Sequence, residues 1–201
     1  FNTIYLIDNN STDKSYEIAK RLEVRNKNIK LSKTGSKKGK GVAISFSREM
    51  IDTSHIIIHD ADLEYFPDDI LEMFEAAKQN TESLILGTRF NGDKSRENIY
   101  VRTYFANKFM SFFFSLINFY KVSDVATCYK LFPNKFFQSI NLFEKGFSIE
   151  IELLSKFLKF NRSIVEIPIK YEGRSYSEGK KIKTKDGILY LINTVKYKLF
   201  T

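Results

Sequence analysis

The feature that most constrains the fold is an alternation of short apolar runs and amphipathic segments along the first half of the chain. Apolar runs of strand length lie at residues 4–7, 29–31, 55–59 and 83–86. Between them, the segments 15–23, 41–50 and 67–77 have the apolar spacing of helices. This alternation is typical of α/β domains, so the sequence predicts an α/β fold with a mainly parallel sheet flanked by helices.

The second half of the chain is helical in pattern and rich in phenylalanine. A helix is predicted over 100–120, where two interpretations stand side by side. In one it is a core helix. In the other it lies at a membrane interface, with Arg102, Lys108 and Lys121 at the headgroups and the phenylalanines in the acyl boundary. Further predictions are a helix at 147–160, a strand at 164–169 and an amphipathic helix at 187–200.

Composition limits the class of protein. With 201 residues, 43% of them hydrophobic and 28% charged, the chain suits one globular domain. Its single cysteine, Cys128, makes an intramolecular disulfide impossible and disfavours a cysteine zinc site, so a reducing, cytoplasmic compartment is expected. No apolar run reaches the length of about 18 residues that a spanning helix needs. The chain opens directly on a strand-like run, from which we expect an upstream segment to be missing.

The net charge of +8 fits three kinds of partner: nucleic acid, anionic lipid or a phosphorylated ligand. The basic residues are not interleaved with an aromatic stacking platform of the kind that binds single-stranded nucleic acid. We therefore expect no nucleic acid partner.

The acidic residues after the run at 55–59 are the centre of the functional prediction. Asp60 and Asp62 are spaced so that both can turn toward one cation where a strand ends, and Glu64 adds a third carboxylate. Hard oxygen ligands suit Mg²⁺ or Mn²⁺, and substrate phosphates commonly complete the shell of such ions. A short acidic pair of this kind is also common in turns that bind nothing.

Two other segments suit a phosphorylated nucleotide. In the glycine-rich loop at 37–41, Lys40 can neutralise phosphate, and Gly41 frees the backbone to approach a ligand. A solvated basic loop is the alternative. In the polar turn at 8–13, Asp8 can accept a hydrogen bond from a base or a ribose, whereas Ser11, Thr12 or Asp13 can cap the next helix.

A third segment, at 171–182, is punctuated by glycines and carries Arg174, Lys180 and Lys181. Such a loop can close over a pyrophosphate and exclude water. Taken alone, it would equally pass for a surface loop.

The order of these motifs resembles that of the family 2 glycosyltransferases, through the segments 8–13, 39–43, 60–64, 67–70 and 87–89. The segments 124–130, 146–150 and 174–187 resemble the dolichyl- and polyprenyl-phosphate sugar transferase branch, which includes dolichol-phosphate mannose synthase. The resemblance covers nearly the whole chain. It departs in two places: an opening strand with its Asn-Glu pair is absent, and Ala126 stands where relatives usually have Glu.

The resemblance implies a single GT-A (Rossmann-like) domain over 1–201, with a nucleotide-sugar half at 1–90 and an acceptor half at 91–201. It implies an inverting transfer from a UDP- or GDP-linked sugar with Mg²⁺ or Mn²⁺. Asp60 would lie near the ribose and the metal, and Asp62 and Glu64 would be metal ligands. Contacts to the donor or to phosphates would come from Asp8, Asn10, Ser11, Asp13, Lys40, Gly41, Arg89, Arg102, Arg174 and Lys180.

On the acceptor side, the resemblance implies roles for Asp124 and Glu150, with a polyprenyl phosphate as acceptor at the cytoplasmic face of a membrane. A lipid phosphate is already an anion and needs no strong base, whereas a hydroxyl acceptor would need one of these two carboxylates. Either carboxylate can instead be a structural hydrogen-bond acceptor. Two alternatives stay open: a soluble family 2 enzyme that extends a polysaccharide or glycan, and an inactive, truncated nucleotide-binding module.

Overall fold

The computed structural model describes residues 3–36, 38–92, 94, 96–97, 100–174 and 184–200. The chain divides into two compact units. Unit 1 comprises Phe1–Thr53 and Asn141–Ile149, and unit 2 comprises Ser54–Ile140 and Glu150–Thr201. These units do not coincide with the halves expected at 1–90 and 91–201, and that functional division stays a prediction.

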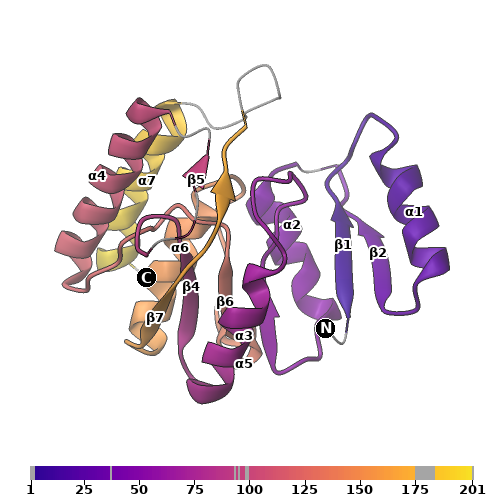
Figure 1. The fold of residues 1–201 in the computed structure, drawn as a ribbon, viewed down its shortest axis with the longest axis horizontal. Helices are drawn as coiled ribbons and strands as arrows, with labels where there is room; N and C mark the ends of the chain where they lie inside the picture. Colours follow the sequence, from indigo (N-terminus) through magenta and orange to yellow (C-terminus); the bar gives the residue numbers. More distant parts are fainter. Residues whose placement is uncertain are drawn as a thin grey trace. The chain divides into compact units, whose positions relative to one another are not determined.

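Unit 1 is built on two parallel strands, β1 (Ile4–Asp8) and β2 (Ile29–Lys33). Helix α1 (Ser15–Arg25) connects them, as the apolar spacing predicts (Figure 1). Helix α2 (Lys40–Ser47) follows and continues into a 3₁₀ turn at Arg48–Met50.

Unit 2 contains a four-stranded sheet in the order β3-β6-β4-β7. Its strands are β3 (His55–Ile57), β6 (Lys130–Pro133), β4 (Leu84–Thr88) and β7 (Ile164–Pro168). Strand β4 pairs with β7 in parallel, whereas β6 is antiparallel to both of its neighbours. The sheet is therefore mixed, and β6 is a strand that the sequence analysis missed. A second small sheet pairs β5 (Arg96–Glu97) with β8 (Tyr171–Glu172).

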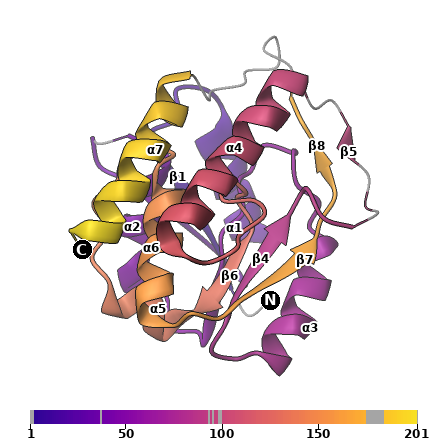
Figure 2. The same cartoon turned by 90° about the vertical axis from the view of Figure 1, so that its left-hand side faces the viewer.

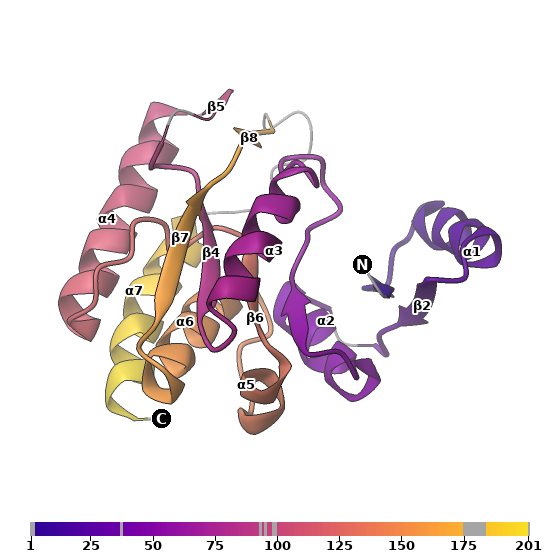
Figure 3. The same ribbon diagram turned by 60° about the horizontal axis from the view of Figure 1, so that its bottom comes forward.

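The helices of unit 2 cover both faces of this sheet. Helix α3 (Asp69–Gln79) lies on one face, and α6 (Ile149–Phe160) lies on the other, with α4 (Val101–Asn118) and α7 (Thr184–Leu199) beyond it (Figure 3). Helices α4 and α7 pack side by side (Figure 2). A short helix that was not predicted, α5 (Asn134–Ser139), follows β6. The expected α/β architecture is confirmed.

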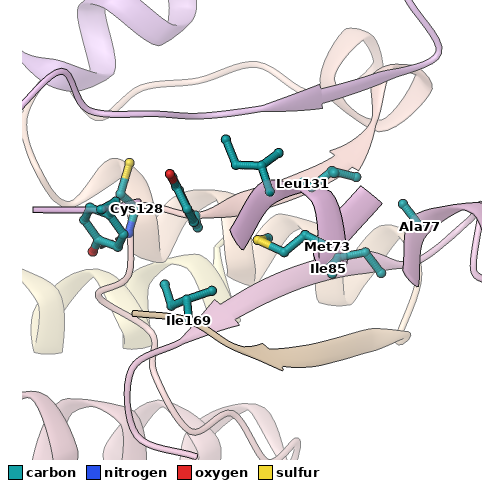
Figure 4. Packing of buried hydrophobic residues seen from close by; sticks show 9 residues of the cluster. Met73, Ala77, Ile85, Cys128, Leu131 and Ile169 are labelled. Carbon is teal, nitrogen blue, oxygen red and sulfur yellow. Dashed lines mark hydrogen bonds between the residues drawn. The ribbon is translucent and has the colours of Figure 1, made fainter. Parts of the chain in front are cut away.

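One part of the core of unit 2 lies between α3 and the sheet. Met73 and Ala77 of α3 pack against Ile85 of β4 and Leu131 of β6 (Figure 4). All five residues of β4 are buried, whereas those of β3 are only half-buried. The reason is that β3 stands at one end of the strand order and pairs on one side only within this sheet.

Helix α4 separates its phenylalanines between two environments. Phe114 is fully buried, whereas Phe105, Phe109, Phe112 and Phe119 are each more than half exposed. The core interpretation therefore holds for one face of this helix and fails for the other. Among the residues that the structure describes, no helix combines the length and the apolar character needed to cross a bilayer.

Candidate active site

The acidic turn that follows β3 is held in a specific conformation. Leu63 adopts a left-handed backbone conformation, with a φ of 63°. Residues other than glycine rarely adopt it, and such positions cluster at functional sites. The Oδ1 of Asp62 accepts the Glu64 N–H at 3.2 Å, and Asp60 is half-buried. Because Leu63 itself is largely exposed, burying its side chain does not explain the turn.

Arg174 lies directly against this turn. Its Nη2 is 3.1 Å from Asp62 Oδ2, and its Nε is 3.5 Å from Glu64 Oε1. The Arg174 backbone N–H also donates to Glu64 Oε1, at 2.9 Å. Asp62 and Glu64 therefore share one guanidinium, although 112 residues separate Arg174 from Asp62 in the chain.

Two neighbours of Arg174 attach to the same glutamate. The Tyr171 hydroxyl donates to Glu64 Oε2 at 3.1 Å, and the Glu172 N–H donates to the Glu64 carbonyl oxygen at 3.0 Å. Burial raises the pKa of Tyr171 to about 12, and the Glu64 carboxylate adds to the rise against the opposing charge of Arg89. The phenol thus stays protonated at neutral pH and keeps donating to Glu64.

The electrostatics of the turn favour a bound cation. Burial raises the pKa of Asp62 above its ordinary value, and the nearby Glu64 and Asp60 carboxylates add to the rise. The Glu64 N–H and the charge of Arg174 oppose it. Neighbouring carboxylates therefore gather negative charge at this turn, and the charge of Arg174 partly offsets it.

The carboxylates fit a metal site of a particular kind. Within the described residues, no group of three or more His, Cys, Asp and Glu side chains is placed to hold a metal ion. The expected set of Asp60, Asp62 and Glu64 is thus not assembled as a protein cage. Asp62 and Glu64 do share a cation in Arg174, and Mg²⁺ is usually bound through one or two carboxylates plus substrate phosphates. The residues fit a metal whose shell a phosphorylated ligand completes.

Arg89 and Asp124 form a buried ion pair next to this turn. Arg89 Nε and Nη2 donate to the two Asp124 oxygens at 2.7 Å and 2.8 Å, and the Arg89 N–H adds a bond of 3.0 Å. Burial opposes the guanidinium charge, but the charge and hydrogen bonds of Asp124, together with Tyr65 and Tyr171, outweigh it, and the pKa of Arg89 is raised well above its ordinary value. The guanidinium also lies 4.9 Å from the Tyr171 ring centroid. Phosphate binding by Arg89 and an acceptor role for Asp124 stay predictions; the structure shows the two joined to each other.

Glu150, the other expected acceptor-side carboxylate, is paired in a similar way. It lies in the first turn of α6 and is bound by Lys130, which is fully buried. Lys130 also donates to the carbonyl oxygens of Val125 and Thr127. The sequence analysis missed Lys130 as a partner; the signal was a lysine beside the apolar residues of β6.

The structure shows one of the two roles that were considered for the polar turn of unit 1. Asp8 is buried at the end of β1 and accepts the Ser11 N–H at 3.3 Å. Asp13 accepts the N–H of Ser15, the first residue of α1, at 3.0 Å, so the helix-capping interpretation is confirmed for Asp13. Asn10 has a left-handed backbone, with a φ of 60°. Nucleoside contact by this turn stays a prediction.

The glycines near Lys40 have a packing explanation. A Cβ on Gly39 would collide with the Lys145 carbonyl oxygen, and one on Gly41 with the Glu144 carbonyl oxygen. The backbone of the 141–149 segment thus requires both glycines in unit 1 without any ligand. A phosphate contact by Lys40 or Gly41 stays a prediction.

Arg102 and Lys180 were also expected to bind phosphate. Arg102 is exposed in the first turn of α4, and Lys180 lies outside the described residues, as do Lys37 and Lys181. His59 bonds to the Tyr129 hydroxyl at 2.9 Å.

Comparison with known proteins decides the family. The family model described as glycosyl transferase family 2 matches residues 2–140. The chain belongs to glycosyl transferase family 2. This glycosyltransferase domain is similar in structure to glucosyl-3-phosphoglycerate synthase from Mycobacterium tuberculosis in complex with phosphoglyceric acid. The TM-score is 0.72 at 13% identity, over 98% of this chain and 69% of that one.

A second structure of that enzyme holds Mn²⁺, UDP-glucose and phosphoglyceric acid. Its TM-score is 0.70 at 13% identity, over 95% of this chain and 68% of that one. A mycobacterial protein matches with a TM-score of 0.71 at 12% identity, over 98% of this chain and 64% of that one. At these identities, the similarity shows that the family 2 domain shares their fold.

Proposed function

We propose that this family 2 domain transfers a sugar, with inversion, from a UDP- or GDP-linked donor, and that it uses Mg²⁺ or Mn²⁺. The observation that carries the proposal is the guanidinium of Arg174, a cation that lies between the Asp62 and Glu64 carboxylates at a turn that follows a strand. In open α/β sheets, ligands bind at such strand ends. The structural similarity to a protein crystallised with Mn²⁺ and UDP-glucose supports the same class of ligand here.

Each residue at the turn has a role in this proposal. Asp62 and Glu64 would hold the metal, and Tyr171 keeps Glu64 oriented through its hydrogen bond. A bound divalent metal neutralises charge that develops on a leaving diphosphate. Arg174 would pair with the same diphosphate, because a guanidinium binds phosphate oxygens in a fork. The turn at Asp8 is proposed, from the family resemblance alone, to contact the nucleoside.

For the acceptor, we propose a polyprenyl phosphate. A hydroxyl acceptor would need Asp124 or Glu150 as its base. Both carboxylates are bound to buried cations, Asp124 to Arg89 and Glu150 to Lys130. A phosphate oxygen is already ionised and attacks without a base, which suits this arrangement. A soluble phosphorylated acceptor is the second candidate, and the similarity to a glucosyl-3-phosphoglycerate synthase favours it.

An exposed apolar stripe on α4 and α7 supports the lipid acceptor. Its members project from one side of each helix and are more than half exposed: Phe105, Phe109, Phe112, Leu116, Phe119, Ile188, Ile192 and Leu199. Lysines border it, and Lys198 Nζ lies 5.7 Å from the Phe119 ring centroid. Apolar faces with basic borders bind anionic membrane surfaces, and large exposed apolar patches mark interaction sites. We propose that this stripe binds a membrane peripherally.

Membrane binding makes a testable prediction. The double substitution Phe105→Ser and Phe112→Ser should weaken binding to vesicles of phosphatidylglycerol and phosphatidylcholine at least about tenfold, because each phenylalanine contributes about 1.5 kcal/mol or more when buried. Co-sedimentation measures the partition coefficient. Leu71→Ser is the matched control, since Leu71 is 65% exposed but lies on α3. Equal binding by the double variant and the native chain would contradict the membrane surface.

The activity itself is tested by a donor and acceptor screen. The chain is incubated with UDP- or GDP-sugars and Mn²⁺, and with either a short polyprenyl phosphate or 3-phosphoglycerate. We expect a glycosylated lipid, with turnover lost in EDTA and restored by Mn²⁺. Product on phosphoglycerate alone would favour the soluble acceptor. No turnover and no metal-dependent nucleotide binding would contradict the proposal and favour the inactive module.

A further inference from the structure

The guanidinium of Arg174 lies between the carboxylates of Asp62 and Glu64. It contacts one carboxylate oxygen of Asp62 and one of Glu64, the two residues proposed as metal ligands. These contacts bring together parts of the chain that are 112 residues apart, so a short-range turn preference does not account for them. Arg174 is only 29% exposed, so solvent screens the contacts incompletely.

A divalent ion and this guanidinium would compete for the same oxygens. Mg²⁺ binds carboxylate oxygens at about 2.0–2.1 Å, whereas the guanidinium nitrogens lie 3.1 Å and 3.5 Å from the oxygens that they contact. A metal on either oxygen would bring two cations into close contact within a partly desolvated site, where their repulsion is strong. Metal binding at these oxygens therefore favours movement of the Arg174 side chain.

The Arg174 backbone N–H is bonded to the Glu64 carboxylate, but the segment has further attachments that do not involve a carboxylate oxygen. The Glu172 N–H is bonded to the Glu64 carbonyl oxygen, which is not part of the carboxylate. The β8 residue Tyr171 also forms a bridge to Tyr65, next to the acidic turn. These contacts keep the segment attached while the guanidinium leaves.

We propose that Arg174 is an exchangeable counterion: it neutralises Asp62 and Glu64 before metal binds, and the metal displaces it toward the diphosphate of the donor. This inference rests on the proposed function for the identity of the diphosphate. It has two consequences. Without nucleotide, Arg174 competes with the metal and weakens its binding. With nucleotide, the displaced guanidinium has a new anion, so metal and nucleotide each strengthen the binding of the other.

The first test is calorimetric titration of Mn²⁺ into the chain without nucleotide. Arg174→Gln should bind Mn²⁺ about tenfold more tightly than the native chain, within the usual range of coupling between sites. Lys78→Gln removes the same charge from an exposed surface pair with Glu75 and should leave the Mn²⁺ affinity within about twofold. Weaker or unchanged Mn²⁺ binding by Arg174→Gln would overturn the proposal.

The second test adds UDP at saturation. UDP should raise the Mn²⁺ affinity of the native chain by a larger factor than that of Arg174→Gln, because only the native chain has the guanidinium to transfer. If UDP does not bind at all while Arg174→Gln still binds Mn²⁺ more tightly, the exchange holds and the proposed donor is wrong. The two failures are thus distinguishable.

A third measurement is made on the native chain, with a conservative variant used only for assignment. The Nε–H resonance of Arg174 is followed by NMR in the native chain during titration with diamagnetic Mg²⁺, and Arg174→Lys assigns the resonance by its loss. We expect the resonance to shift and its exchange with water to accelerate as the metal binds. A resonance that is unchanged when Mg²⁺ is saturating would overturn the exchange.

Discussion

Asp62→Asn is expected to lower kcat for sugar transfer by about 100-fold or more, the usual cost of losing one preorganised electrostatic group at a reacting centre. The amide keeps the size of the carboxylate but cannot supply the negative charge that holds a divalent ion. Steady-state transfer assays over a range of Mn²⁺ concentrations measure the effect. The Mn²⁺ affinity should fall with kcat, because both depend on the same oxygen atoms.

The matched control is Asp68→Asn. Asp68 is an exposed carboxylate at the start of α3, six residues along the chain, and its loss should change kcat by less than about twofold, as expected for a surface substitution. Retention of most of the activity in Asp62→Asn, or an equal loss in Asp68→Asn, would show that Asp62 is not part of the reaction site.

A measurement of stability shows whether the loss of kcat in Asp62→Asn comes from misfolding. Because the pKa of Asp62 is raised in the folded chain, the folded state holds its proton at a pH where the unfolded state has released it. The contribution of Asp62 to the free energy of unfolding therefore falls as the pH rises from the unfolded value of 3.8 to the raised folded value. At neutral pH the ionised Asp62 opposes folding, and thermal melting should show Asp62→Asn to be no less stable than the native chain.

Arg89→Ala is expected to lower the free energy of unfolding by about 3–5 kcal/mol, the usual cost of leaving a buried charge without its partner. Asp124 has no exposed surface, and Arg89 supplies hydrogen bonds to both of its oxygens. Urea unfolding followed by circular dichroism measures the loss. Arg89→Lys should show a smaller loss, because it keeps the charge but not the fork of two donors.

Two comparisons make this prediction specific. The double variant Arg89→Met with Asp124→Leu should lose less stability than Arg89→Ala, because no unpaired charge remains in the core. Lys78→Ala, which breaks an exposed pair with Glu75, should cost no more than about 1 kcal/mol. If Arg89→Ala costs no more than Lys78→Ala, the pair is not structural, and the phosphate-binding role predicted for Arg89 gains support.

Local sequence was sufficient to predict the longer helices, several strands and the class of fold. Helix α1 follows from Tyr16, Ala19 and Leu22 at helical spacing, and β4 follows from a compact apolar run, because both patterns are properties of neighbouring residues. The acidic turn at residues 60–64 was found because carboxylates after an apolar run stand out in the sequence. The order of such motifs also indicated the family, which the family model confirmed.

Strand β6 shows where local pattern failed. Lys130 opens this strand, and its four residues are too few to show a period of their own. Its place between β3 and β4, antiparallel to both, depends on partners elsewhere in the chain. The glycines at 39 and 41 have a packing role that the sequence did not show, because a Cβ at either position would collide with the backbone of Lys145 or Glu144.

The α/β class, the family and the acidic turn were predicted from the sequence alone, because each depends on residues that are close together along the chain. Only the tertiary structure decided the partners of the charged groups. It joined Arg89 to Asp124 across 35 residues and Arg174 to Asp62 across 112. The identity of a charged residue does not show which opposite charge it pairs with, because the pairing depends on how the core packs and on the cost of burying either charge alone.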